Sequence, residues 1–203
     1  MQSRNARPSL LRAGSSLSDI VLVIATALNK EGICAVLTGD GAAAMHISRN
    51  RQLARLHYTL TSPVAASRLA SAVRHLGFEL TGDGHYRHAG MDIVLELTQT
   101  PLAIGRNDKI AAQTLQLRHG FVRILSPSDC CREQLMAWRA TRQGGAMQTA
   151  VDLAKHGEIN MPDLRAWMRT EGFQGVWPGF KRSVEGTHEP FVLTRARVAT
   201  RRH

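Results

Sequence analysis

The sequence is poor in cysteine, in aromatic residues and in long apolar runs. Its cysteines, Cys34, Cys130 and Cys131, are odd in number, two are adjacent, and none forms a CxxC pair. This argues against a disulfide framework and against a zinc site, and it predicts a cytoplasmic protein with free thiols. The longest apolar run, residues 20–28, is about half of the roughly 20 residues that cross a bilayer, so we expect no membrane partner.

Acidic residues are also scarce relative to basic ones. The 203 residues include 26 Lys and Arg against 16 Asp and Glu, which gives a net charge of +10. Much of the excess lies near the two ends, in residues 4–12 and 181–202. Such a charge attracts polyanions and favours a nucleotide or a nucleic acid as partner. A surface that is basic only for solubility is the alternative.

The length and the residue patterns predict one main domain with a helical appendage. We expect four parts: a disordered basic arm (1–15), an α/β domain (16–125), a helical subdomain (126–172) and a basic, partly ordered tail (173–203). Apolar spacing and turn residues predict the following elements. They are a helix over 16–32, a strand over 33–38, a helix over 42–47, a strand over 54–60, a helix over 62–77, β segments at 78–80, 86–88 and 91–97, a hairpin over 114–125, and helices over 126–143, 146–156 and from 161 onward.

The segment from Val36 to Leu60 carries the most specific pattern. A buried strand is followed by the turn Gly39-Asp40-Gly41, an alanine-rich helix, a basic loop and a second strand. Glycines after a buried strand let backbone amides approach a phosphate, because no side chain stands in the way. An ordinary tight turn has the same composition, and Asp40 would repel a phosphate.

This layout resembles the opening of the nucleotidyltransferase fold, the small α/β unit that transfers nucleoside monophosphates from nucleoside triphosphates. The resemblance extends to a loop over 101–105 and to the element Leu125-Ser-Pro-Ser-Asp129-Cys130. It is similar to uncharacterised bacterial nucleotidyltransferase-like proteins of the AbiEii type and to minimal nucleotidyltransferases. It implies an α+β fold, with a nucleotidyltransferase-type mixed sheet flanked by helices and then a small helical subdomain of about three helices.

The chain departs from the family at the positions that matter for catalysis. The family pattern places two aspartates, one residue apart, on the second strand, and these positions are Arg55 and His57 here. A guanidinium has no lone pair for Mg²⁺, and imidazole is a poor Mg²⁺ ligand. No Asp or Glu lies between Asp40 and Glu79. We therefore expect no metal and no other cofactor, with Mg²⁺ required only if catalysis persists.

One hypothesis follows for Arg55. It stands where a cation would lie, and it could pair with Asp92 or Glu96, in the region of the family's third carboxylate. If any catalytic residues remain, they are these two acids. A solvated strand face explains both acids equally well.

Three functions stay open. The favoured one is a catalytically degenerate nucleotidyltransferase-like protein that binds a nucleotide or RNA without ordinary two-metal transfer. The second is an active enzyme that transfers a nucleotide to RNA or to a small hydroxylated acceptor. The third is a non-catalytic, antitoxin-type module that binds DNA through basic tails, and the resemblance also implies a protein partner in a toxin–antitoxin or defence module. The candidate nucleotide-binding residues are Gly39, Asp40, Gly41, Arg51, Arg55 and His57.

Overall fold

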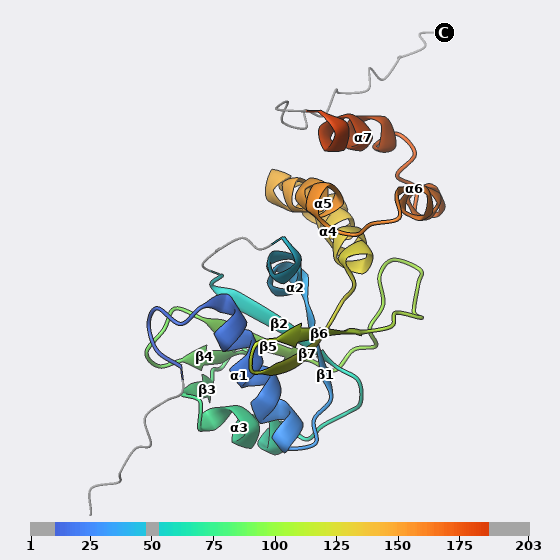
Figure 1. The fold of residues 1–203 in the computed structure, drawn as a ribbon. Coiled ribbons are helices and arrows are strands. Elements are labelled where there is room, and N and C mark those ends of the chain that lie inside the picture. Colours follow the sequence, from blue (N-terminus) through green and yellow to red (C-terminus); the bar gives the residue numbers. More distant parts are fainter. Residues whose placement is uncertain (1–10, 48–52, 187–203) are drawn as a thin grey trace, which may run out of the picture.

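A mixed sheet forms the centre of the chain. The computed structural model describes residues 11–47 and 53–186, and within them seven strands are ordered β3-β4-β5-β2-β1-β7-β6 (Figure 1). Strand β1 is antiparallel to β2 and parallel to β7, while β2 is parallel to β5. The predicted mixed sheet is therefore confirmed. The strands are β1 Ala35–Thr38, β2 Arg55–Leu60, β3 Phe78–Leu80, β4 Tyr86–His88, β5 Val94–Thr98, β6 Gln113–Leu117 and β7 Gly120–Ile124.

Seven helices accompany the sheet within the same residue ranges. Helices α1 and α3 pack against each other, and α2 lies between the sheet and the pair α4–α5 (Figure 1). The last four helices, α4–α7, are called the helical part below. The helices are α1 Leu17–Lys30, α2 Gly39–His46, α3 Ala66–Arg74, α4 Pro127–Thr141, α5 Gly144–His156, α6 Met161–Thr170 and α7 Trp177–Glu185.

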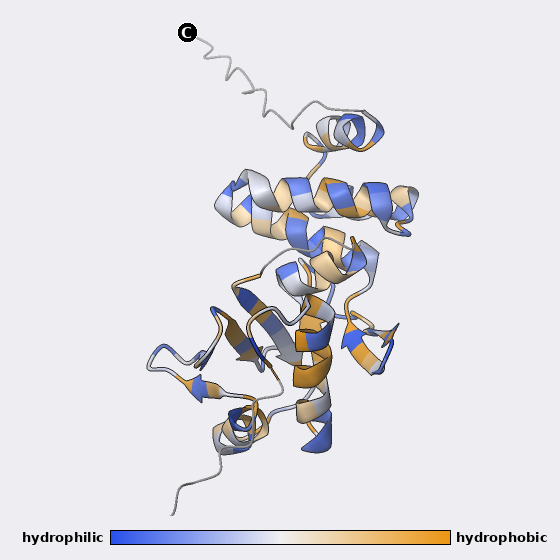
Figure 2. Ribbon diagram, turned by 60° about the vertical axis from the view of Figure 1, so that its left-hand side comes forward, coloured by the Kyte–Doolittle hydropathy of each residue, from blue (hydrophilic) through white to orange (hydrophobic). Residues whose placement is uncertain are grey.

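Helix α1 is the main apolar cover of the sheet. It is coloured hydrophobic along most of its length in Figure 2, and it buries Val21, Ile24 and Leu28 completely. Tyr58 of β2 is also fully buried, and its hydroxyl donates a hydrogen bond to the Val21 carbonyl at 3.0 Å. A buried phenol needs such a partner, because an unsatisfied hydroxyl in the core is costly. This face of β2 therefore belongs to the core.

The helical part has its own aromatic core. Trp138 of α4 lies 6.4 Å from Phe173, and Trp167 of α6 stacks on the same ring at 5.8 Å. Phe180 of α7 is fully buried. None of the helices in the described ranges is long and apolar enough to span a membrane.

Several predicted boundaries were wrong for identifiable reasons. Helix α3 begins at Ala66 rather than near residue 62, because the Val64 amide donates to the Gln99 side chain at 2.7 Å and the chain stays extended there. Helices α4 and α5 separate at Arg142, which is left-handed with φ of 57°, whereas Gly144 begins α5.

Two further differences concern the ends of the described chain. Within the arm predicted as disordered, Leu11 is buried in the core, and residues 1–10 lie outside the described ranges. Helix α7 occupies part of the predicted tail, so the helical part has four helices where about three were expected. Pro178 lies in the first turn of α7, a position that favours a helix start, and its presence had indicated a loop.

Candidate functional site

A cleft of about 410 Å³ opens where the sheet meets the helical part. One side of the cleft is formed by β2, β5 and the start of α2, and all five of its lining residues are ones that the sequence analysis proposed. The remaining lining comes from α4, α5 and the connection between them, including Glu133, Gln134, Thr141 and Thr149. The sequence-predicted residues in the cleft are Gly39, Asp40, Arg55, His57 and Glu96.

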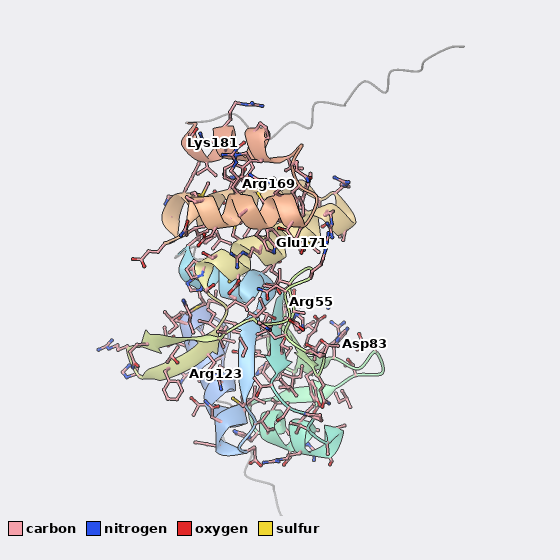
Figure 3. The ribbon with its side chains drawn as sticks, turned by 90° about the vertical axis from the view of Figure 1, so that its right-hand side faces the viewer. Arg55, Asp83, Arg123, Arg169, Glu171 and Lys181 are labelled. Carbon is pink, nitrogen blue, oxygen red and sulfur yellow. The ribbon has the colours of Figure 1, made fainter. Side chains whose placement is uncertain are left out.

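The strand register brings three of these side chains together. His57 of β2 is paired with Glu96 of β5, and Arg55 lies two residues earlier on β2. Alternate residues of a strand point to the same side, and directly paired residues share a face, so all three side chains emerge on one face of the sheet. Arg55 forms an ion pair with Glu96 across the two strands. In Figure 3, Arg55 lies at the level where the sheet meets the helices.

The predicted pairing of Arg55 thus involves Glu96. Asp92, the other predicted partner, precedes β5 in a bend and does not line the cleft. It was expected on the same strand face as Glu96, but the strand begins only at Val94. The structure therefore brings one of the two predicted acids to Arg55.

His57 is held beside this ion pair as a neutral ring. Burial lowers its pKa, and the positive charge of Arg55 lowers the pKa further. Its Nε2 atom lies 2.9 Å from the Thr98 hydroxyl. The imidazole therefore contributes a polar, uncharged group to the cleft at neutral pH.

The beginning of α2 is tied to α4 by two hydrogen bonds. Gly39 adopts φ of 62°, which glycine accepts without strain, and its N–H donates to Oε2 of Glu133 at 2.7 Å. One residue further along each helix, the Gln134 amide donates to Oδ1 of Asp40 at 3.0 Å. Each acid at this end of the cleft therefore has a donor from the opposite helix.

Glu133 is an unusual carboxyl group. Burial raises its pKa to about 7, and the negative charges of Asp40 and Asp129 act in the same direction, while the hydrogen bond from Gly39 opposes them. The protonated form of this carboxyl group therefore persists to a higher pH than that of an ordinary glutamate.

Sequence reasoning did not identify Glu133 or Gln134 as site residues. A signal was present, because Gln134 lies among the buried Cys130, Cys131 and Trp138 of an otherwise amphipathic helix. A buried polar side chain between apolar neighbours requires a partner from another element. That partner, Asp40, is remote in sequence and could not be read from the pattern of α4.

Two candidate residues have other positions. Gly41 is buried within α2, and an added Cβ would lie 3.0 Å from a Leu56 methyl and 3.2 Å from a Leu37 methyl. Its small size thus serves the packing of α2 on β1 and β2. Arg51 lies outside the described residues.

The acids of the cleft do not form the metal site of the family pattern. A two-metal site needs carboxylates that share cations about 3.5–4 Å apart. Asp40, Glu96 and Glu133 are instead bound to Gln134, Arg55 and the Gly39 amide respectively. Within the described ranges, no three His, Cys, Asp or Glu side chains gather closely enough to hold a metal ion. The residues present therefore do not fit a pair of Mg²⁺ ions.

No family model matches the chain, and no curated protein sequence does either. Solved structures do match. An antigenic nucleotidyltransferase-like protein from Paracoccidioides brasiliensis is similar with a TM-score of 0.62 and 14% identity, over 88% of this chain and 96% of that one. The solution structure of the antibiotic-resistance factor ANT(2'')-Ia has a TM-score of 0.53 and 14% identity, over 82% and 97%.

ANT(2'')-Ia in complex with adenylyl-2''-tobramycin is also similar, with a TM-score of 0.51 and 12% identity over 79% of this chain and 98% of that one. At these identities the likeness concerns the fold alone. The seven-stranded mixed sheet and the helices around it agree with that likeness. The chain therefore has a nucleotidyltransferase-like fold.

Proposed function

We propose that this chain binds a nucleotide, or the phosphates of an RNA, in the cleft and does not carry out ordinary two-metal transfer. The observation that carries the proposal is the ion pair between Arg55 and Glu96. It puts a permanent cation on the strand that holds paired carboxylates in the family pattern. The chain is then a degenerate member of this fold, with a protein cation in place of a metal.

A guanidinium is well suited to binding the phosphates of a nucleotide. It carries a fixed positive charge and a planar set of N–H donors that match phosphate oxygens. The Arg55 side chain is 55% exposed, against 17% for Glu96, so part of it faces the solvent while Glu96 holds it from the sheet side. It offers no coordination site to a hydroxyl or to a leaving pyrophosphate, so binding is retained and transfer is not.

Other groups of the cleft fit the rest of a nucleotide. The first turn of α2 directs the positive end of its helix dipole toward the cleft, which favours an anion there. Thr141, Gln143 and Thr149 on the opposite wall supply uncharged hydrogen-bonding groups for a sugar or a base.

The proposal is tested by titrating the full chain with ATP, GTP, CTP, UTP and a short RNA, each with and without Mg²⁺. We expect binding that does not require Mg²⁺. Arg55→Ala should weaken it by roughly 10- to 100-fold, because a hydrogen bond to a charged group contributes about 1.5–3 kcal/mol. Arg87→Ala is the matched control, since Arg87 is exposed to a similar degree and pairs with Asp83 outside the cleft. Equal behaviour of the two variants would contradict the proposal.

Active transfer is the second candidate, and the convergence of Asp40, Glu96 and Glu133 on one cleft favours it. The test is an incubation with labelled nucleoside triphosphates, Mg²⁺ or Mn²⁺, and RNA or a small acceptor. Tobramycin is one acceptor to include, because ANT(2'')-Ia was solved with its adenylyl derivative. Label transfer that disappears in Glu96→Gln would replace the binding proposal by this one.

The third hypothesis, DNA binding through basic tails, rests on the arm 1–15 and on residues 181–203, of which 1–10 and 187–203 lie outside the described ranges. Truncation of residues 187–203 should reduce the salt dependence of DNA binding if the tail neutralises phosphates. An unchanged slope would count against the tail.

A further inference from the structure

Two groups of the cleft that could receive a phosphate are already bound to a carboxylate of the chain. Arg55 is paired with Glu96, and the Gly39 amide donates to Glu133. The two groups differ in the number of hydrogen bonds that they can donate. A guanidinium has five N–H donors and can bind Glu96 and a phosphate together, whereas a backbone amide has one hydrogen. The Gly39 amide is therefore the point at which a ligand and the protein exclude each other.

We propose that Glu133 competes with the ligand's phosphate for the start of α2, so that a phosphate enters only when the Glu133 carboxylate leaves Gly39 or takes up a proton. This inference rests on the nucleotide binding proposed above and adds how that binding is controlled. The competing group belongs to α4, so the helical part contributes the control and the sheet domain contributes Arg55.

The charges around Glu133 favour the replacement of its carboxylate by a phosphate at Gly39. The negative charges of Asp40, on α2, and of Asp129, which is paired with Arg132 on α4 itself, both act on Glu133. Across the cleft, β2 supplies Arg55 and the neutral His57, and β5 supplies Glu96. The lining residues of α5, which are Gly145, Ala146 and Thr149, carry no charge. Among the residues that line the cleft, Asp40, Glu96 and ionised Glu133 face the guanidinium of Arg55. Protonation of Glu133 removes one repulsion at the place where a phosphate would lie.

The size of the effect follows from the fraction of protein that can bind. Burial raises the pKa of Glu133 to about 7, so the protonated fraction falls with each pH step above neutrality. If only the protonated form binds, the apparent dissociation constant is the intrinsic one divided by that fraction, which gives roughly tenfold weaker binding at pH 8 than well below pH 7. Glutamine at this position stays neutral, like the protonated acid, and its amide oxygen accepts from Gly39 more weakly than a carboxylate does, so it competes less with a phosphate.

The test titrates wild type and Glu133→Gln with inorganic tripolyphosphate between pH 5.5 and 8.5, using the full chain. Protonation of the probe affects both proteins equally, so the ratio of their dissociation constants isolates Glu133. We expect this ratio to rise from about one at the acid end to roughly ten at pH 8. Glu79→Gln, on the exposed part of β3, is the matched control and should follow wild type.

A second measurement needs no variant. Carbon-13 NMR of the glutamate carboxyl groups in wild type should show the Glu133 signal moving toward the protonated form at pH 7 when tripolyphosphate is added. A ratio independent of pH, or a Glu133 signal that does not respond, would overturn the inference and leave nucleotide binding intact. Absence of binding of tripolyphosphate and of nucleoside triphosphates to both proteins at every pH would refute both proposals.

Discussion

Replacing Glu133 with glutamine should change the stability of the chain in a pH-dependent way without any ligand. Burial raises the pKa of this carboxyl group from 4.5 to about 7 in the folded chain. The folded state therefore binds the proton more tightly than the unfolded state, and the associated stability is fully present below pH 4.5 and is lost as pH rises through 7. The difference corresponds to roughly 3 kcal/mol of unfolding free energy.

Urea unfolding followed by tryptophan fluorescence at several pH values between 4 and 8.5 measures this loss. Glutamine does not ionise, so the unfolding free energy of wild type should fall relative to Glu133→Gln by about 3 kcal/mol between pH 4.5 and pH 8. Most of the change should occur before pH 7. Glu79→Gln removes a charge from an exposed position and should remain parallel to wild type. If wild type and Glu133→Gln stay parallel, Glu133 is not a desolvated carboxylate and the reasoning fails.

Two other predictions concern packing. Gly105→Ala should lower the unfolding free energy by about 1–3 kcal/mol more than Gly84→Ala. Both glycines have positive φ, but an added Cβ at Gly105 would lie 2.6 Å from the Glu171 carboxyl carbon whereas Gly84 has open space; equal melting temperatures would contradict this. Iodoacetamide should modify only Cys34 in the native chain, because the other two cysteines are buried and their thiol pKa values are raised; mass spectrometry showing either of them labelled would refute it.

Local signals explain most of what the sequence predicted correctly. Ser16 and Ser126 cap α1 and α4 by accepting the amides of Asp19 and Asp129, three residues later in each case. Such motifs involve a few consecutive residues, so they can be read without knowledge of the fold. Strand β4 has the predicted bounds for the same reason, since turns flank its short alternating pattern on both sides.

The pairing of Arg55 with Glu96 was predictable by another route. The two residues are far apart in the chain, and no periodicity relates them. A resemblance to a known fold supplied the neighbouring strands, and the parallel register of β2 and β5 then brings the two side chains together. The prediction that Asp92 shares this strand face was wrong. The residue at which β5 begins decides which residues lie on the face, and the ends of strands are weakly encoded in the sequence.

The contact between Glu133 and Gly39 could not be predicted, although it joins α4 to the start of α2 in the cleft. The two residues are 94 positions apart, and neither helix contains a motif that requires the other. Packing of α4 on α2 brings the acid to the amide, and only the packed structure shows that the acid is partly buried there.

Together these contacts have a consequence for how a degenerate site would be controlled. A two-metal enzyme leaves its carboxylates open to solvent cations, so its state depends on the metal concentration. In this chain Arg55 supplies the positive charge permanently, and N–H donors of the protein already satisfy Asp40, Glu96 and Glu133. Burial raises the pKa of Glu133 to about 7. Under the proposals made here, the variable that sets the charge of the cleft is therefore the proton, and Glu133 is the residue through which it acts.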